Sequence, residues 1–157
     1  MKKSRSDESP SVNVRRAAMN LLARREQSFQ ELLQKLTQKY PELDKDSIIL
    51  PALERLREEN LQSDARFLES YVRYRSSRGN GPLKITMELQ QKGINQRESE
   101  SEVYSPDYDW IALCREAMDK KFDAEAEMTR AERDKCYRFL AQRGFDSEQI
   151  RVVMKGK

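Results

Sequence analysis

The sequence predicts an all-α protein, and three observations support this fold class. Apolar residues recur at spacings of three and four along most of the chain, which is the period of an amphipathic helix. Two capping boxes, Ser28-x-x-Glu31 and Thr129-x-x-Glu132, mark helix starts. Only five glycines and five prolines interrupt the 157 residues, and the runs of Val and Thr that favour strands are scarce.

The first third of the chain predicts three helices behind a polar tail. Residues 1–11 are polar and are expected to be disordered. A first helix follows this tail, and a second begins at the capping box of Ser28. Asp46 or Ser47 is expected to cap a third helix. Pro51 lies inside the apolar pattern of that helix, which indicates a start about one turn later.

The remaining helices are predicted from residues that favour helix starts. Side chains of Ser, Thr and Asp at these positions accept a hydrogen bond from an amide that the helix leaves unpaired. The expected starts are Ser63 or Asp64, Ser105-Pro106, Thr129, and Asp146 or Ser147. A short, acidic helix is expected at residues 95–103.

A glycine-rich corner, Gly-Asn-Gly-Pro at residues 79–82, separates two of these helices. Glycine and asparagine tolerate positive φ at low cost, so Gly79, Asn80 and Gly81 are expected to break the preceding helix. Pro82 suits the first turn of the next one, where its missing N–H would be unpaired anyway. The two glycines are also expected to bring backbone close to a docking partner.

The helices repeat as a three-helix unit. Leu36, Leu89 and Leu140 lie near the end of the middle helix of each unit, at spacings of 53 and 51 residues. The leading helices carry cations at equivalent positions, namely Arg25, Arg75 and Lys121. Such a period indicates units that pack mainly on their neighbours. We therefore predict an elongated tandem array of three three-helix repeats with about nine helices, at residues 12–62, 63–104 and 105–157, behind the tail 1–11.

Charge alternates along the chain although the net charge is only +3. Residues 1–40 and 71–97 each carry a net charge of +5, whereas 41–70 carry −4 and 98–109 carry −5. The rest of the chain carries +2. Bands of opposite sign suit a partner with its own charged groove or a phosphate backbone.

Several classes of function are disfavoured by what the sequence lacks. It contains no histidine and no Walker-type phosphate loop, so we expect a non-enzyme with no cofactor and no bound metal. Cys114 and Cys136 are expected to be buried free thiols in a reducing compartment. No apolar run reaches the ~18 residues of a membrane span, and the basic start lacks the apolar core of a secretory signal. These features predict a cytoplasmic protein without membrane contact, and nothing demands more than a monomer.

Basic side chains are the candidate binding residues, because arginine and lysine bind carboxylates and phosphates. Those on or near the corner are Arg73, Arg75, Arg78, Lys84 and Lys92, with Tyr71 and Tyr74 between them. A second group in the first helix contains Arg24 and Arg25, beside Arg15 and Arg16. Arg143 is the counterpart in the third repeat. The alternative is that these residues form ordinary solvated helix faces. Tyr71 and Trp110 are interpreted as core residues rather than contact residues.

Five segments resemble one known family, the RecX regulators of the bacterial RecA recombinase. They are DARF, RSSRGNGP and ELQQKGI in the middle of the chain, and DWIALCREAMDKKF and RFLAQRGF towards its end. The similarity covers about residues 15–155. The chain departs from the family at Asn80, where an aromatic residue usually stands between the two glycines.

This resemblance implies a function. RecX proteins bind in the helical groove of the RecA nucleoprotein filament, bridge its protomers, suppress ATP hydrolysis and strand exchange, and favour disassembly. The implied partners are therefore the RecA filament and, weakly, single- or double-stranded DNA. The matching motifs place the site at the corner Arg75–Lys84 and at Arg143-Gly144.

Two other functions stay open at this point. The corner Arg78–Ile85 between two helices is similar to a helix-turn-helix, whose second helix would present Lys84 and Lys92 to DNA. Apart from Gln90 and Gln91, that helix has few side chains that read bases, and a pI of about 8.8 is modest for a dedicated nucleic-acid-binding protein. The third possibility is a helical-repeat adaptor for another protein.

Overall fold

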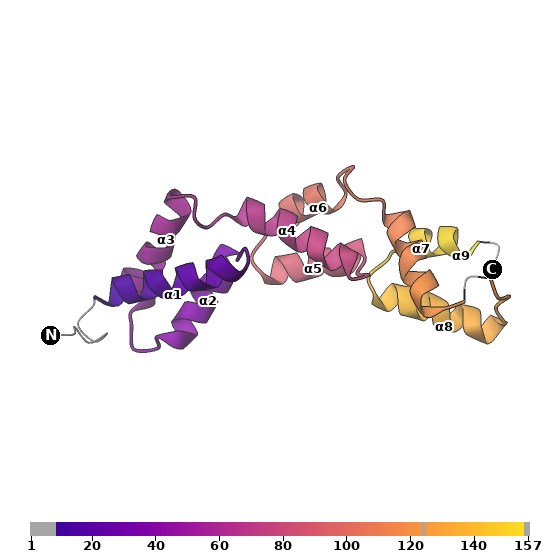
Figure 1. The fold of residues 1–157 in the computed structure, drawn as a ribbon, viewed down its shortest axis with the longest axis horizontal. Helices are drawn as coiled ribbons and strands as arrows, with labels where there is room; N and C mark the ends of the chain where they lie inside the picture. The colour runs from indigo at the N-terminus through magenta and orange to yellow at the C-terminus, as the bar shows by residue number, and fades with distance from the viewer. Residues whose placement is uncertain (1–8, 124, 156–157) are drawn as a thin grey trace. The chain divides into compact units, whose positions relative to one another are not determined.

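The structure is a computed structural model that describes residues 9–123 and 125–155. These residues form nine α-helices and one π-helical turn and contain no strand (Figure 1), which confirms the all-α prediction. The helices are α1 (Pro10–Arg24), α2 (Phe29–Lys39), η2 (Lys45–Ile49), α3 (Leu50–Glu58), α4 (Asp64–Ser77), α5 (Pro82–Gln91), α6 (Gln96–Val103), α7 (Trp110–Lys121), α8 (Arg130–Gln142) and α9 (Ser147–Met154). None of these helices is long and apolar enough to cross a membrane.

The chain forms two compact units, one up to Leu68 and one from Glu69 onward. The boundary lies inside α4, whose first turn belongs to the N-terminal unit. Each unit has its own buried apolar residues. A chain with 36% charged residues has few apolar side chains to bury, so a divided core is expected.

The predicted disordered tail is wrong at residues 9–11, which belong to the cap and first turn of α1. Residues 1–8 lie outside the described part of the chain, but Ser9 already caps α1. Its hydroxyl oxygen accepts a hydrogen bond from the amide of Val12 at 3.3 Å. Pro10 occupies the first turn, where its fixed φ suits a helix. Ser-Pro is therefore a helix start here and not part of a polar linker.

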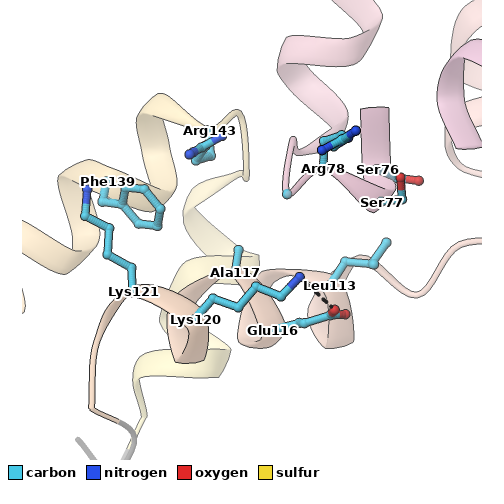
Figure 2. A pocket seen from close by; sticks show the side chains of 11 residues that line it. Ser76, Ser77, Arg78, Leu113, Glu116, Ala117, Lys120, Lys121, Phe139 and Arg143 are labelled. Carbon is cyan, nitrogen blue, oxygen red and sulfur yellow. Dashed lines mark ion pairs between the residues drawn. The ribbon is translucent and has the colours of Figure 1, made fainter. Parts of the chain in front are cut away.

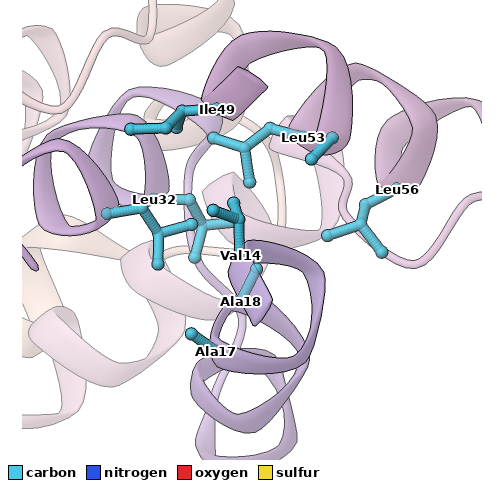
Figure 3. Close-up of a cluster of buried hydrophobic side chains, with 9 residues drawn as sticks. Val14, Ala17, Ala18, Leu32, Ile49, Leu53 and Leu56 are labelled. Atoms are coloured by element: carbon cyan, nitrogen blue, oxygen red, sulfur yellow. The ribbon is translucent and has the colours of Figure 1, made fainter. Parts of the chain in front are cut away.

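The core of the N-terminal unit is a cluster of apolar side chains from α1, α2, η2 and α3 (Figure 3). The cluster contains Val14, Ala17, Ala18, Leu32, Leu36, Ile49, Ala52, Leu53 and Leu56. Their spacing of three and four places one apolar stripe on each helix, as the sequence predicted. Truncating one buried leucine of such a cluster to alanine costs about 2–5 kcal/mol.

The predicted capping box at the start of α2 is confirmed and is buried. The amide of Glu31 donates to the hydroxyl oxygen of Ser28 at 3.1 Å, and the amide of Ser28 donates to the Glu31 carboxylate at 3.2 Å. The guanidinium of Arg25 binds the same carboxylate at 2.6 Å. Arg25 therefore neutralises a buried charge within its own unit.

The third helix begins differently from the sequence prediction. Asp44, and not Asp46 or Ser47, supplies the cap, since its carboxylate accepts from the amide of Ser47 at 2.9 Å. The π-helical turn η2 follows, and Pro51 lies in the first turn of α3. The α-helical part, α3, thus begins about one turn later, as Pro51 indicated, and follows the π-helical turn η2.

The two candidate caps of α4, Ser63 and Asp64, bind different helices. The hydroxyl oxygen of Ser63 accepts from the amide of Arg66 at 3.2 Å and caps the helix. The Asp64 carboxylate instead accepts from the amide of Phe29 at 2.8 Å, at the start of α2.

In the C-terminal unit α5 packs on α6, and α7 packs on α8 and α9. The buried apolar residues of these helices include Ile85, Leu89, Val103, Cys114, Met118, Cys136, Leu140, Ile150 and Val153. Trp110 is buried as predicted, and its indole N–H donates to the carbonyl of Val103 at 2.7 Å. The predicted start of α7 at Ser105-Pro106 is wrong. The helix begins at Trp110, because the carboxylate of Asp109 accepts from the amide of Ala112 at 3.1 Å.

Candidate functional site

The corner between α4 and α5 has one residue with positive φ, not three. Gly79 has φ +83° and ends α4. Asn80 acts through its side chain, since its amide nitrogens on the backbone and side chain both donate to the carbonyl of Arg75, at 3.2 and 3.1 Å. Gly81 has φ −91°, which any residue adopts. The expectation of positive φ at Asn80 and Gly81 is therefore wrong.

Gly81 is required for a different reason, a backbone contact with a second corner of the same unit. Its amide donates to the carbonyl of Arg143 at 2.7 Å, and the amide of Leu83 donates to the carbonyl of Gly144 at 2.9 Å. A Cβ at Gly81 would overlap the backbone of Gly144, and a Cβ at Gly144 would overlap Lys84. The sequence predicted that the glycines of this corner bring backbone close to a docking partner. In the structure, the backbone of Gly81 instead lies close to that of Gly144, so that the α4–α5 corner packs against the α8–α9 corner.

Several of the predicted binding cations have carboxylate partners within the chain. Arg75 binds Glu88 of α5 at 3.0 Å, with their side chains only 26% and 17% exposed. The hydroxyl of Tyr71 donates to the same carboxylate at 2.9 Å. Arg73 binds Glu69 one turn earlier on α4 at 2.8 Å. With Arg25 on Glu31, these three arginines each have a carboxylate partner within the chain.

The other predicted residues lie in varied surroundings. Arg24 is exposed in the last turn of α1. Lys84 is half-buried where α5 meets Gly144. The ammonium of Lys92 lies 5.5 Å from the ring centre of Tyr71.

Arg78 and Arg143, by contrast, line one groove of about 440 Å³ (Figure 2). We call this the cationic groove. Its walls come from the end of α4, one face of α7 and the end of α8. The full lining is Ser76, Ser77, Arg78, Gly79, Leu113, Glu116, Ala117, Lys120, Lys121, Phe139 and Arg143. Four cations thus face one groove with a single carboxylate.

Aromatic rings, rather than carboxylates, lie under three of these cations. The guanidinium of Arg78 is 5.3 Å from the ring centre of Tyr74. Lys121 and Arg143 approach the ring of Phe139 at 4.3 and 5.2 Å. Within the described part of the chain, Lys120 alone of the four forms an ion pair, with Glu116 at 3.3 Å. The charge of the groove is therefore largely uncompensated, since a ring orients a cation without neutralising it.

Sequence reasoning missed Lys120 and Lys121 as groove residues. The sequence repeat could have pointed to Lys121, because this residue occupies in the third repeat the position that Arg25 and Arg75 occupy in the first two. Those two arginines each bind a glutamate, whereas Lys121 lies over Phe139. No group of three or more Cys, Asp or Glu in the part that the structure describes could hold a metal ion.

Fold and groove together define a class, an all-α protein of tandem three-helix units with a positively charged groove. The family descriptions "RecX, second three-helix domain" and "RecX, third three-helix domain" match residues 63–99 and 107–154. The chain belongs to the RecX family.

Relatives and solved structures agree with this assignment. The regulatory protein RecX of Pseudomonas entomophila (strain L48) is 42% identical over 93% of this chain and 92% of its own. That of Pseudomonas putida (strain GB-1) is 40% identical over the same shares. The crystal structure of RecX from Lactobacillus salivarius has a TM-score of 0.73 at 22% identity, over 93% of this chain and 95% of that one. The fold is therefore shared even where the sequences have diverged.

Proposed function

We propose that the protein regulates RecA in the cytoplasm by binding its nucleoprotein filament, and that it acts by binding rather than by catalysis. It inhibits ATP hydrolysis and strand exchange, promotes filament disassembly, and so modulates homologous recombination and DNA repair. The observation that carries this proposal is the 42% identity over 93% of the chain to a regulatory protein RecX. A match of this extent leaves little of the chain for an unrelated activity.

The surface of α5 supports a protein partner. Leu83 and Met87 lie one turn apart on this helix and are 53% and 54% exposed. Large apolar side chains exposed together favour contact with another protein surface. They would add little to binding on the phosphate backbone of DNA, where charge dominates affinity.

The geometry of α5 disfavours the helix-turn-helix alternative. In that motif the N-terminal residues of the second helix contact base edges in the major groove. Here the N-terminus of α5 packs against the α8–α9 corner, and the amide of Leu83 is bonded to Gly144. The backbone at this end of α5 is thus already packed within the chain, which disfavours its insertion into a DNA groove.

The test is the DNA-dependent ATPase rate of RecA with this protein added at sub-stoichiometric and near-stoichiometric ratios. We expect the rate to fall, with no hydrolysis by the protein alone. The control is an unrelated nucleoprotein filament, whose ATPase rate should not change. An unchanged RecA rate with the protein in excess at low salt would refute the proposal and favour the helical adaptor.

A further inference from the structure

A band of negative charge at residues 98–109 has no part in the proposed function. The band carries a net charge of −5 and spans most of α6 and the turn that leads to α7. Glu100 and Glu102 lie in the last turn of α6, at the end of a helix where cations rather than anions are favoured. Helix stability therefore does not explain these two carboxylates.

The band ends at a hollow of about 470 Å³ between the first turns of α7 and α9. We call it the acidic hollow. The rings of Tyr108 and Trp110 stack at its wall, with 5.6 Å between their centres. Aromatic rings and three carboxylates thus face one space, and no basic side chain of the described residues lines it. The lining is chiefly Tyr108, Asp109, Trp110, Asp146, Glu148 and Gln149.

Helix capping explains the positions of two of these carboxylates. Asp109 accepts from the amide of Ala112 at 3.1 Å, and Asp146 accepts from the amide of Gln149 at 2.7 Å. Each bond uses only the Oδ1 atom of its aspartate. Neither aspartate, nor Glu148 beside them, forms an ion pair within residues 9–123 and 125–155. Capping therefore leaves the negative charge of the hollow uncompensated.

The side chain of Gln149 indicates which kind of ligand the hollow takes. Gln149 is only 9% exposed and lines the hollow. Its Oε1 accepts from the amide of Asp146 at 3.0 Å, which fixes the orientation of the side-chain amide. Its Nε2 donates to no acceptor among the residues that the structure describes. Because an unpaired donor in a nearly buried side chain is costly, a ligand that supplies an acceptor is favoured.

This requirement separates the possible cationic ligands. A metal ion or a protonated polyamine would meet the carboxylates but has no acceptor for Gln149. A protein segment has backbone carbonyls that accept, and its arginine side chains suit the rest of the lining. A guanidinium stacks on aromatic rings and binds carboxylates through its planar fork.

We infer that the acidic hollow binds an arginine-bearing segment of a protein partner. The guanidinium lies over Tyr108 and binds Asp109 and Asp146, while a backbone carbonyl of the segment accepts from Nε2 of Gln149. The inference does not depend on the proposed function, because it rests on the hollow alone and its test contains no RecA.

The fluorescence of Trp110, the single tryptophan, reports directly on the hollow. The probe is a short peptide of glycine and serine around one arginine, with both ends blocked, titrated into the full-length protein at low salt. Citrulline in place of the arginine keeps the shape without the charge and should weaken binding at least about tenfold, because hydrogen bonds to charged groups are the strong ones. Added salt should weaken the arginine peptide, since exposed charges are screened. A lysine peptide that binds as tightly would overturn the assignment to arginine.

The double variant Asp109→Asn, Asp146→Asn removes two charges from the hollow and keeps both helix caps, because asparagine caps as well as aspartate. It should bind the arginine peptide at least about tenfold more weakly. The matched control is Asp44→Asn with Asp46→Asn, which also removes a capping aspartate and a neighbour, at the start of η2. This control should bind like the parent. Equal loss in the two double variants, or no binding of the arginine peptide by the parent, would overturn the site.

Two further measurements separate a protein segment from a simple cation. Ethylguanidine carries the same cation without a backbone, so the parent should prefer the peptide. Gln149→Glu keeps the acceptor that caps α9 but loses the donor, and should reduce this preference. An unchanged preference would refute the backbone contact, and spermidine or calcium that displaces the peptide as well as ethylguanidine does would refute the arginine assignment. Thermal unfolding of each variant shows that any loss of binding comes from contact.

Discussion

Gly81→Ala should destabilise the protein more than Gly79→Ala, although Gly79 is the glycine with positive φ. A Cβ at Gly81 would overlap backbone atoms of Gly144 and Phe145, which cannot rotate aside as a side chain can. The two corners would have to separate. Both backbone hydrogen bonds between them, which end at the carbonyls of Arg143 and Gly144, would then lengthen or break.

The expected magnitude follows from these contacts. Each hydrogen bond contributes about 0.5–1.5 kcal/mol to the free energy of unfolding, and overpacking costs about 1–3 kcal/mol. We therefore expect Gly81→Ala to lower the free energy of unfolding by about 2–6 kcal/mol. At Gly79 an added Cβ would meet Ala117 at 3.9 Å, an ordinary contact. Only the left-handed backbone remains as a cost there, about 1–2 kcal/mol.

Urea unfolding followed by the fluorescence of Trp110, the single tryptophan, measures both changes. Hydrogen exchange at the amide of Leu83 adds a local readout, because that amide donates across the two corners. In Gly81→Ala, exchange at Leu83 should become faster than the loss of global stability alone would explain. In Gly79→Ala, the change in exchange at Leu83 should match the loss of global stability. The reasoning is wrong if Gly81→Ala unfolds at the parent's urea midpoint and keeps the protection of Leu83.

Two further changes test the packing of the C-terminal unit. Arg75→Gln should lower the free energy of unfolding by about 1–3 kcal/mol, since it leaves the half-buried carboxylate of Glu88 without its cation. Arg73→Gln, which removes an exposed pair on the same helix, should cost about 0–1 kcal/mol, and equal losses in thermal unfolding would contradict the structural role of Arg75. Burial raises the pKa of the Cys114 thiol from its usual value of 9.0 to about 12. Above pH 9 the unfolded chain releases this proton while the folded chain keeps it, so the free energy of unfolding should fall as the pH rises from 9 towards 12. Cys114→Ala should show a smaller fall over that range in urea titrations, and parallel curves for parent and variant would contradict the buried thiol.

The helices and their starts were largely predictable because the forces that set them act over a few residues. The capping boxes at Ser28 and Thr129 each join positions three apart, and both form as expected. The repeat was visible for the same reason, since Leu36, Leu89 and Leu140 are each buried on the middle helix of a three-helix repeat. The errors at Asp44 and Asp109 came from several acceptors competing within one short segment, where the sequence offers no means of choosing among them.

Partners that lie far apart in the chain could not be predicted in this way. Gly81 and Gly144 are separated by most of the C-terminal unit, and only the fold shows that they leave each other no room for a Cβ. The sequence correctly marked Gly81 as a close approach of backbone but assigned it to an external partner. The motif looks the same in either case, because a missing side chain does not identify the surface that approaches it.

The sequence by itself therefore determined the fold class, the three-helix repeat and the abundance of cations near the corner. Only the tertiary structure decided which cations carry uncompensated charge. Arg75 and Arg78 lie one turn apart on the same segment, yet Arg75 reaches Glu88 whereas Arg78 lies over Tyr74 at the groove. The physical reason is that the charge a cation presents to a partner depends on every carboxylate within a few ångströms, and these come from helices that only folding brings together.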